Sequence, residues 1–194
     1  MVIGLMGGIG SGKSTVLDYL EQYYNAEIIQ ADLVAKEVMK PGHQVFEKVV
    51  QIFPDVIKDG QIDSGKLSEV VFSDETKLQK LNAITHPGTV EEIISQIKNS
   101  TADIIVVESA LMLGSGLEAY VDELWFVFCE KNIRIERLIE NRGYTREKAE
   151  QIIANQPSDE EYNLAADEFI DNSHSAEATR ERIDILLSAQ DCGE

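Results

Sequence analysis

The strands of this chain are predicted from short apolar runs between polar or glycine-rich segments. Residues 104–107 and 124–128 are apolar at every position, a pattern typical of strands that are covered on both faces in a parallel sheet. The N-terminal residues 2–6 have the same buried character. Two shorter strands are predicted at 27–30 and 168–170.

Helical spacing of apolar residues fills the intervals between these strands. Val16, Leu17 and Leu20 give a helix over residues 13–24 one apolar face. Thr145 and Ser175 are expected to cap the helices that follow them. The remaining predicted helices span residues 32–40, 44–53, 133–142, 146–155, 159–166 and 175–187.

In residues 58–99, a turn and a proline are expected to interrupt the alternation of strands and helices. The sequence at 58–61 predicts a turn, and residues 64–99 are helical in pattern without a strand. Pro87 is expected to interrupt that helix at residues 85–87, because proline lacks the backbone donor and its ring clashes with the preceding turn.

Strands that alternate with helices predict an α/β fold with a doubly wound parallel sheet, whose ligands bind at the carboxyl ends of the strands. Residues 1–32, 100–130 and 166–194 are expected to form the core around the sheet. Residues 33–99 and 131–165 are longer than a crossover requires. We expect the first to be a helical substrate-binding insertion and the second to be a mobile lid.

The composition indicates a folded protein and excludes some partners. A chain of 194 residues with 43% apolar and 27% charged residues suits one compact domain with insertions. The net charge of −18, from 35 acidic and 17 basic side chains, disfavours duplex nucleic acid or an anionic membrane as a partner.

The cellular location of the protein is predicted from the length of its apolar segments and from its N-terminal sequence. None approaches the roughly 20 residues needed to cross a bilayer, and no secretory signal pattern follows Met1. A cytoplasmic protein is therefore expected. Cys129 and Cys192 form neither a disulfide framework nor a metal site, and we expect both thiols to be reduced and chemically passive.

One motif indicates phosphate chemistry. Residues 7–14 read Gly-Gly-Ile-Gly-Ser-Gly-Lys-Ser, which satisfies G-x-x-x-x-G-K-[ST] between a predicted strand and a helix. The backbone N–H groups of such a loop form an anion-binding nest at a helix N-terminus. Lys13 is expected to contact the β- and γ-phosphates of ATP, Ser14 to ligate Mg²⁺, and Thr15 to lie beside the α-phosphate. The backbone contacts to ATP are expected from Gly8, Ile9, Gly10, Ser11 and Gly12.

Two carboxylates follow predicted strands. Asp32 comes just after the second strand, where it is placed to accept a proton from an acceptor hydroxyl; the alternative is an N-cap for a helix beginning at Leu33. Glu108 ends the strand at 104–107, where it is placed to hold Mg²⁺ through water; the alternative is an exposed strand end.

Four of the six arginines fall within thirteen residues, at Arg134, Arg137, Arg142 and Arg146. Planar guanidinium groups suit phosphate recognition, and Arg134 and Arg137 would share one helix face. The alternative is a solvated helix face with ion pairs to the nearby glutamates Glu136, Glu140 and Glu147.

Taken together, these motifs resemble the dephospho-CoA kinases over nearly the whole chain. The resemblance is carried by residues 4–16, Ala31-Asp32, residues 81–87 with the sequence Leu-Asn-Ala-Ile-Thr-His-Pro, Gln156, Ala166-Asp167 and Ile170-Asp-Asn172. It implies that Asp32 receives the hydroxyl proton and contacts substrate, that His86 lies in the substrate-binding part, and that Arg137 belongs to a lid that closes on phosphate. Without the resemblance, His86 before proline indicates a structural residue at a helix end.

The chain departs from the family pattern at four places. Gln30 stands where the family has an aspartate, Gly114 replaces the acid of a Pro-Leu-Leu-Phe-Glu segment, and Asn141 occupies the place of a second lid arginine with Arg142 adjacent. Tyr162 stands where lysine is usual. The ATP contacts, which include Arg142, are retained more fully than the substrate contacts, and a divergent active enzyme is predicted.

The resemblance implies ATP-dependent phosphorylation of the ribose 3′-hydroxyl of dephospho-CoA, the last step of coenzyme A biosynthesis, in a P-loop NTPase fold with Mg²⁺ as cofactor. The alternatives are a kinase for another nucleotide or small alcohol, and a nucleotide-dependent regulatory module. ATP and dephospho-CoA are the expected partners, with no nucleic acid and no membrane, in a monomer or weak homo-oligomer.

Overall fold

The computed structural model describes residues 1–110 and 112–191. The chain forms two compact units. One contains residues 1–28 and 100–194, and the other contains residues 29–99. We call the first the sheet unit and the second the helical unit. The described part of the chain has no helix with the length and apolar character required to span a membrane.

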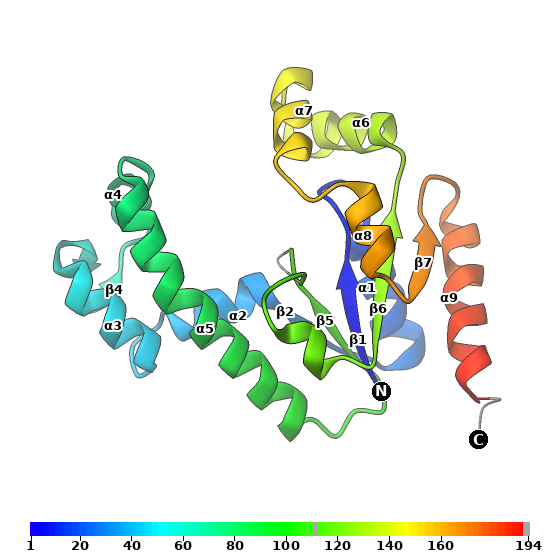
Figure 1. Cartoon of the computed structure of the whole chain (residues 1–194), viewed down its shortest axis with the longest axis horizontal. Helices are drawn as coiled ribbons and strands as arrows, with labels where there is room; N and C mark the ends of the chain where they lie inside the picture. The colour runs from blue at the N-terminus through cyan, green and yellow to red at the C-terminus, as the bar shows by residue number, and fades with distance from the viewer. Residues whose placement is uncertain (111, 192–194) are drawn as a thin grey trace. The chain divides into compact units, whose positions relative to one another are not determined.

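A five-stranded parallel sheet forms the centre of the fold (Figure 1). Its strands are β1 (Val2–Met6), β2 (Glu27–Gln30), β5 (Ile105–Glu108), β6 (Glu123–Phe128) and β7 (Glu168–Asp171), in the spatial order β2-β5-β1-β6-β7. β1 pairs in parallel with both β5 and β6, so the chain leaves the middle of the sheet at Met6. The predicted doubly wound parallel sheet is confirmed, with strand bounds shifted by one residue at most.

Alternating side chains of the sheet are buried under different helices. Trp125 and Val127 lie in the core formed with α1 (Lys13–Tyr24) and α9 (Ala176–Asp191). Phe126 points to the opposite face, where Tyr162 of α8 (Asp159–Ala165) stacks on it with ring centroids 5.2 Å apart. Helices therefore cover both faces of the sheet, as the continuous apolar strands require (Figure 1).

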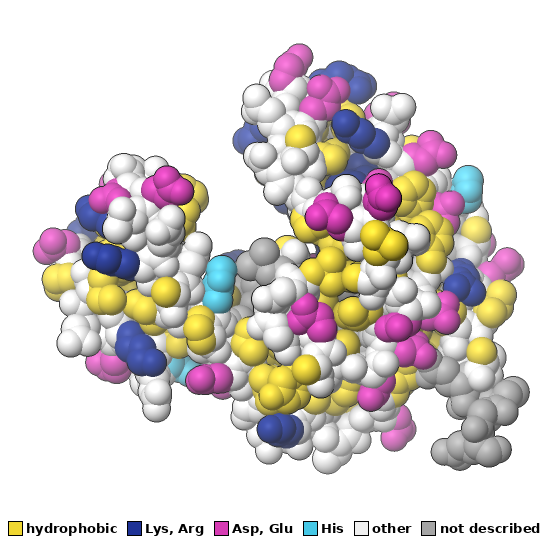
Figure 2. Space-filling model, viewed as in Figure 1, with side chains coloured by type: hydrophobic (Ala, Val, Ile, Leu, Met, Phe, Trp, Pro, Cys, Tyr) yellow, Lys and Arg dark blue, Asp and Glu magenta, His cyan; other side chains and the backbone are white. Residues whose placement is uncertain are grey.

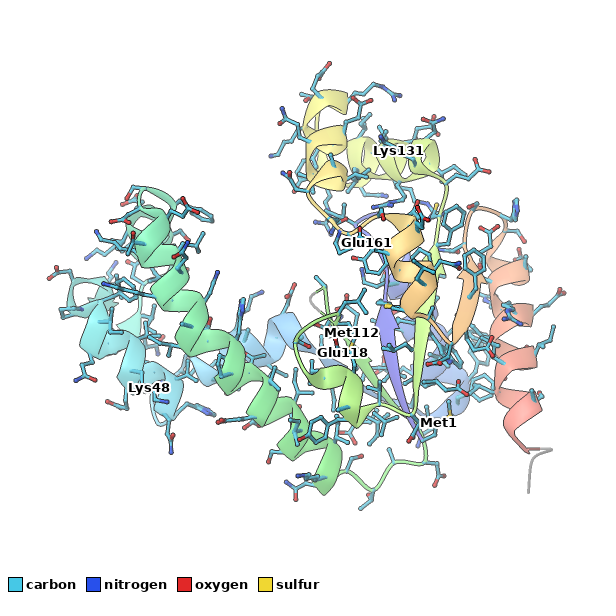
Figure 3. The ribbon with its side chains drawn as sticks, viewed as in Figure 1. Met1, Lys48, Met112, Glu118, Lys131 and Glu161 are labelled. Atoms are coloured by element: carbon cyan, nitrogen blue, oxygen red, sulfur yellow. The ribbon has the colours of Figure 1, made fainter. Side chains whose placement is uncertain are left out.

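The β5–β6 and β6–β7 connections complete the sheet unit. The first contains the short 3₁₀ helix η2 (Leu117–Tyr120); Figure 3 labels Met112 and Glu118 on this connection. The second contains α6 (Lys131–Arg142), α7 (Arg146–Ala154) and then α8. Thr145 accepts a hydrogen bond from Lys148 N and Ser175 accepts one from Ala178 N, which confirms both predicted caps.

The helical unit contains four α-helices and a small hairpin. Its elements are α2 (Ala31–Val38), α3 (Gln44–Ile52), the 3₁₀ helix η1 (Pro54–Val56), β3 (Ile57–Lys58), β4 (Gln61–Ile62), α4 (Ser64–Phe72) and α5 (Glu75–Asn99). The predicted turn joins β3 to β4, with positive φ at Asp59 and Gly60. Two-residue strands are too short to leave an alternating pattern, so the sequence does not predict them.

The predicted interruption at Pro87 is wrong. α5 continues through Pro87, and the break falls instead at residues 73–74, before Glu75. α5 packs against α2, α3 and α4, with Thr85, Thr89 and Ile93 buried. One turn is held so closely that a Cβ added to Gly88 would lie 2.2 Å from a methyl group of Val45. Packing along the whole helix offsets the cost of a proline, which is roughly 3 kcal/mol in a helix interior.

Candidate functional site

The predicted phosphate loop connects β1 to α1 and is built from tight backbone turns. Ser11 N donates to Gly8 O at 3.1 Å, and Thr15 N donates to Gly12 O at 3.0 Å. Gly10 and Gly12 have φ angles of 78° and 89°, a left-handed conformation that favours glycine. Gly12 is the N-cap of α1 and supplies no capping side chain, so the first N–H groups of α1 are open to an anion.

Lys13 is held at the base of this loop by two oxygen atoms. Its Nζ donates to Gly7 O at 2.9 Å and lies 3.5 Å from Oε1 of Glu108. Each of the two side chains is only 16% exposed. Glu108 reaches Lys13 because β5 pairs with β1, with Glu108 opposite Leu5. The interpretation of Glu108 as an exposed strand end is therefore wrong.

The residues predicted for Mg²⁺ fit a phosphate-bound ion better than a site made by protein alone. Ser14 presents its hydroxyl at the start of α1, where the side chain is exposed, and Glu108 supplies a carboxylate. Among the described residues no group of three histidine, cysteine or acidic side chains is arranged to hold a metal. Mg²⁺ usually takes one or two protein oxygens together with phosphates and water, and these two residues fit that pattern.

Arg134 of α6 reaches the phosphate loop from outside and is almost fully buried, with 4% of its surface exposed. Its Nε donates to Ile9 O at 2.9 Å. Its two terminal nitrogens lie 3.2 Å from Asp159 Oδ1 and 3.3 Å from Gln156 Oε1. The interpretation of this arginine as part of a solvated face is wrong, and its acidic partner is Asp159 rather than a glutamate of α6 or α7.

Arg137, one helical turn later, also contacts the loop backbone. Its Nη1 donates to the carbonyl oxygens of Gly10 and Ser11, each at 3.3 Å, and its Nη2 donates to Asn172 O at 3.0 Å. The side chain of Asn172 is buried and donates to Ser11 O at 2.7 Å. Gly12 leaves the space for this contact, because a Cβ there would lie 2.0 Å from Asn172 Nδ2.

The other two clustered arginines behave as surface residues. Arg142 is exposed at the end of α6, and Arg146 is exposed and lies 4.0 Å from Glu150. Figure 2 shows Lys and Arg side chains gathered over α6 and α7, and Figure 3 labels Lys131 at the start of α6. The cluster therefore divides into Arg134 and Arg137, which bind the loop, and a solvated pair.

Asp32 and His86 lie in the helical unit, and their placement against the phosphate loop stays a prediction. Asp32 is exposed in the first turn of α2, whose N-cap is Gln30, so the capping interpretation of Asp32 is wrong. His86 is exposed in the middle of α5 and does not end a helix. The structural alternative for His86 at a helix end is wrong as well.

Two departures from the family pattern have local structural roles, and a third lies at the surface. Tyr162 is buried against Phe126, and burial raises the pKa of its phenol. Gly114 has a φ of 80° and donates its N–H to the carboxylate of Glu118, so this turn suits glycine where the family has an acid. Asn141 is exposed near the end of α6.

Gln156 and Asn172 were given no role from the sequence, although both belong to the resemblance. Gln156 Oε1 accepts from Ile9 N at 2.7 Å, and Asn172 contacts Ser11 O. They lie 147 and 161 residues from their loop partners in sequence. An amide residue that recurs at a fixed place in a family is the only signal by which sequence reasoning could have found them.

Comparisons with known proteins agree with this geometry. The family model for dephospho-CoA kinase matches residues 1–178. The dephospho-CoA kinase of Carboxydothermus hydrogenoformans is 42% identical over 192 residues, which cover 96% of this chain and 92% of that protein. The crystal structure of TT1252 from Thermus thermophilus has a TM-score of 0.83 at 26% identity, over 100% of this chain and 98% of that one. The dephospho-CoA kinase from Campylobacter jejuni shares the fold, with a TM-score of 0.72 at 22% identity over 100% and 98% of the two chains. On this evidence the chain is a P-loop kinase that belongs to the dephospho-CoA kinase family.

Proposed function

We propose that this chain transfers the γ-phosphoryl group of ATP to the ribose 3′-hydroxyl of dephospho-CoA, giving coenzyme A and ADP in the last step of coenzyme A biosynthesis. One observation carries the proposal: a complete phosphate loop, supported from behind by buried polar side chains, in a chain that aligns with dephospho-CoA kinases over 96% of its length. The loop supports nucleotide binding, and the family relationship supports the acceptor.

ATP binding requires Lys13 to exchange partners. The N–H groups of Gly10, Gly12, Lys13 and Ser14 contact the phosphates in this proposal, because those of Ile9, Ser11 and Thr15 already donate to protein oxygens. The Thr15 side chain lies near the α-phosphate, and Arg142 lies at the outer part of the nucleotide. Lys13 moves from Gly7 O and Glu108 to the β- and γ-phosphates, whose greater negative charge attracts it more strongly than one carboxylate. Glu108 is then released for a second task.

That task is to help hold Mg²⁺. Ser14 would offer its hydroxyl to the ion, and Glu108 would offer its carboxylate through water. When bound, Mg²⁺ neutralises charge on the phosphate oxygens. Ser14 and Glu108 themselves position the phosphates, and Lys13 stabilises the charge that develops on the transferred group.

The acceptor hydroxyl is oriented by Asp32. Its carboxylate is exposed, and the N-cap position of α2 is taken by Gln30, so helix capping does not occupy it. In this proposal Asp32 accepts the proton of the 3′-hydroxyl as the oxygen attacks phosphorus, while His86 contributes to binding the substrate.

Residues 131–165 act as the lid, and Arg137 is their catalytic contribution. Its guanidinium lies on the carbonyls of Gly10 and Ser11, so its charge stays beside the phosphates that the loop holds. Excluding water strengthens that attraction, because the effective dielectric constant falls. The core that binds ATP then comprises residues 1–32, 100–130 and 166–194, and residues 33–99 bind dephospho-CoA.

The net charge of the chain bears on where its substrates bind. Both substrates are small anions, so the net charge of −18 demands that cations be concentrated where phosphates bind. We propose a cytoplasmic enzyme, monomeric or weakly associated, that binds neither nucleic acid nor a membrane.

The test is ADP release with ATP and Mg²⁺ across a panel of acceptors: dephospho-CoA, adenosine, nucleoside monophosphates and shikimate. Dephospho-CoA should give the highest kcat/KM. Dephospho-CoA at background with turnover of another acceptor would replace the assignment by a kinase for that acceptor. Tight ATP binding with no acceptor-stimulated turnover would indicate a nucleotide-dependent regulatory module.

A further inference from the structure

Ile9, at the tip of the phosphate loop, is held from three directions. Its N–H donates to Gln156 Oε1 at 2.7 Å, and its carbonyl accepts from Arg134 Nε at 2.9 Å. Its side chain packs in a small apolar cluster with Ile135 and Leu138 of α6 and Ala149 of α7. The loop tip is therefore fixed by residues more than a hundred positions later in the chain.

Arg134 joins these contacts into one network. One terminal nitrogen donates to Gln156 Oε1, the same oxygen that binds Ile9 N–H, and the other pairs with Asp159. The guanidinium lies so close to the loop that a Cβ on Gly8 would be 2.0 Å from Nη2. At 4% exposure and with all three nitrogens occupied, the guanidinium has no free face to present to a ligand.

The peptide geometry shows what this network does. In a trans peptide the C=O and N–H groups point in opposite directions, so a held carbonyl also fixes the next N–H. Arg134 holds Ile9 O and thereby directs Gly10 N–H away from itself. Arg137 and Asn172 hold Ser11 O and direct Gly12 N–H in the same manner.

An anion nest needs such support, because its N–H dipoles converge and repel one another until a phosphate arrives. A loop that spreads in the free protein must be reordered on binding, which costs affinity. A loop whose carbonyls are already held does not incur this cost, and its donors meet the charge in the transition state without reorganisation.

We propose that Arg134 is a positioning residue for nucleotide binding: it contacts no phosphate and acts through Ile9, by fixing the Ile9–Gly10 peptide for the phosphates of ATP. The inference rests on the nucleotide binding in the proposed function and is independent of the acceptor. Arg134 thus differs from Arg137, to which the charge-stabilising role is assigned.

The test compares Arg134→Lys with Arg146→Lys, an exposed arginine of the same segment. Lysine keeps the charge but cannot donate to Ile9, Gln156 and Asp159 together. We expect Arg134→Lys to weaken binding of a non-hydrolysable ATP analogue roughly tenfold or more, the effect of one lost charge-assisted hydrogen bond. Arg146→Lys should bind like the unaltered protein. The dissociation constant is measured by calorimetry at several salt concentrations.

The salt dependence separates positioning from direct contact. If Arg134 acts through Ile9, its replacement shifts the dissociation constant equally at every salt concentration. A neutral variant, Arg134→Gln, should then keep the salt slope of the unaltered protein; a shallower slope would mean a lost charge–phosphate contact and would overturn the proposal. Binding of Arg134→Lys within twofold of the unaltered protein would overturn it too.

A second pair of variants covers the case in which Arg134 variants fail to fold. Gln156→Glu keeps an oxygen acceptor for both Ile9 N–H and Arg134, whereas Gln156→Leu removes it. The first should retain analogue binding and the second should weaken it roughly tenfold; equal binding by the two would contradict the inference. If the unaltered protein binds the analogue but does not phosphorylate dephospho-CoA, the proposed function fails while this inference stands.

Discussion

The two units of this kinase are prepared for their tasks in different ways. In the sheet unit, the candidate groups Lys13 and Arg137 are already hydrogen-bonded to backbone carbonyls of the phosphate loop. In the helical unit, Asp32 and His86 are exposed side chains on α2 and α5. A phosphate group is the same in every cycle and suits a rigid site, whereas an acceptor hydroxyl must be delivered by a larger substrate. The difference suggests preorganisation on the ATP side and recruitment on the acceptor side.

The two units also differ in net charge. Residues 1–28 and 100–194 carry 24 acidic and 9 basic side chains, whereas residues 29–99 carry 11 and 8. Figure 2 shows acidic side chains spread over the visible face of the sheet unit. In a unit whose net charge repels anions, we expect the few cations at the phosphate loop to decide where ATP binds. The helical unit is closer to neutral, which suits a substrate that is anionic but long.

The largest expected effect on kcat comes from replacing Asp32 in the helical unit. Asp32→Asn keeps size and hydrogen bonding but cannot accept a proton, so kcat should fall by roughly 10² to 10⁴ if Asp32 is the base. The melting temperature should hardly change, because Asp32 caps no helix. Asp55→Asn, an exposed aspartate of the same unit, is the matched control. Equal kcat values for the two variants would remove Asp32 from the mechanism.

The next largest effect on kcat comes from replacing Lys13 in the sheet unit. Lys13→Ala removes a charge that stabilises the transition state and should lower kcat roughly a hundredfold or more. The exposed Lys131→Ala serves as its control. Because Lys13 is paired with Glu108 before ATP binds, Lys13→Ala also leaves a partly buried carboxylate alone, and a small loss of melting temperature is expected. Near-normal turnover with an intact fold would refute the role of Lys13.

A smaller effect is expected when the loop keeps its lysine but loses Arg137. Arg137→Ala removes donors to Gly10, Ser11 and Asn172, and kcat/KM for ATP should fall roughly tenfold. Arg180→Ala is the comparison, because Arg180 is exposed on α9 and lies over the ring of Tyr19. Steady-state kinetics on both variants measure the contrast. Equal losses would mean that arginines of this unit act only through stability.

These contrasts also show what the sequence could predict. The strands, the phosphate loop and the caps at Thr145 and Ser175 depend on local patterns, and those predictions were confirmed. The break at Pro87 was wrong because packing along α5 outweighs a local preference. Local rules predict an element well when its stability is local, and they fail where tertiary contacts decide.

The residues of the candidate site also divide into those that belong to a local motif and those that tertiary contacts bring together. The phosphate loop is a contiguous motif, so Lys13 and Ser14 can be proposed as site residues from spacing alone. The support of that loop by Arg134, Gln156 and Asn172 arises from contacts across more than a hundred residues, and no spacing rule reaches so far. Cys192, predicted to be passive like Cys129, lies outside the described residues.

The smallest expected effect tests the buried network through its pH dependence. Cys129 is 1% exposed, and its sulfur lies 3.4 Å from Nη1 of Arg137. Burial raises the pKa of this thiol above its ordinary value of 9.0, and the nearby Arg137 opposes the rise without cancelling it. The folded protein therefore keeps the thiol proton at a pH where the unfolded chain has released it.

The sign of the effect follows from this difference. The thiol's contribution to stability is fully present below pH 9.0 and is lost as pH rises from there through the folded pKa. In a Cys192→Ser background, the melting temperature should fall more steeply as pH rises above about 9 with Cys129 present than in Cys129→Ala. Parallel curves would mean that the guanidinium of Arg137 fully offsets burial. The contacts of Arg137 next to the phosphate loop would then accommodate a thiolate at Cys129. The contrast between a preorganised ATP site and an exposed acceptor site would be weaker in that case.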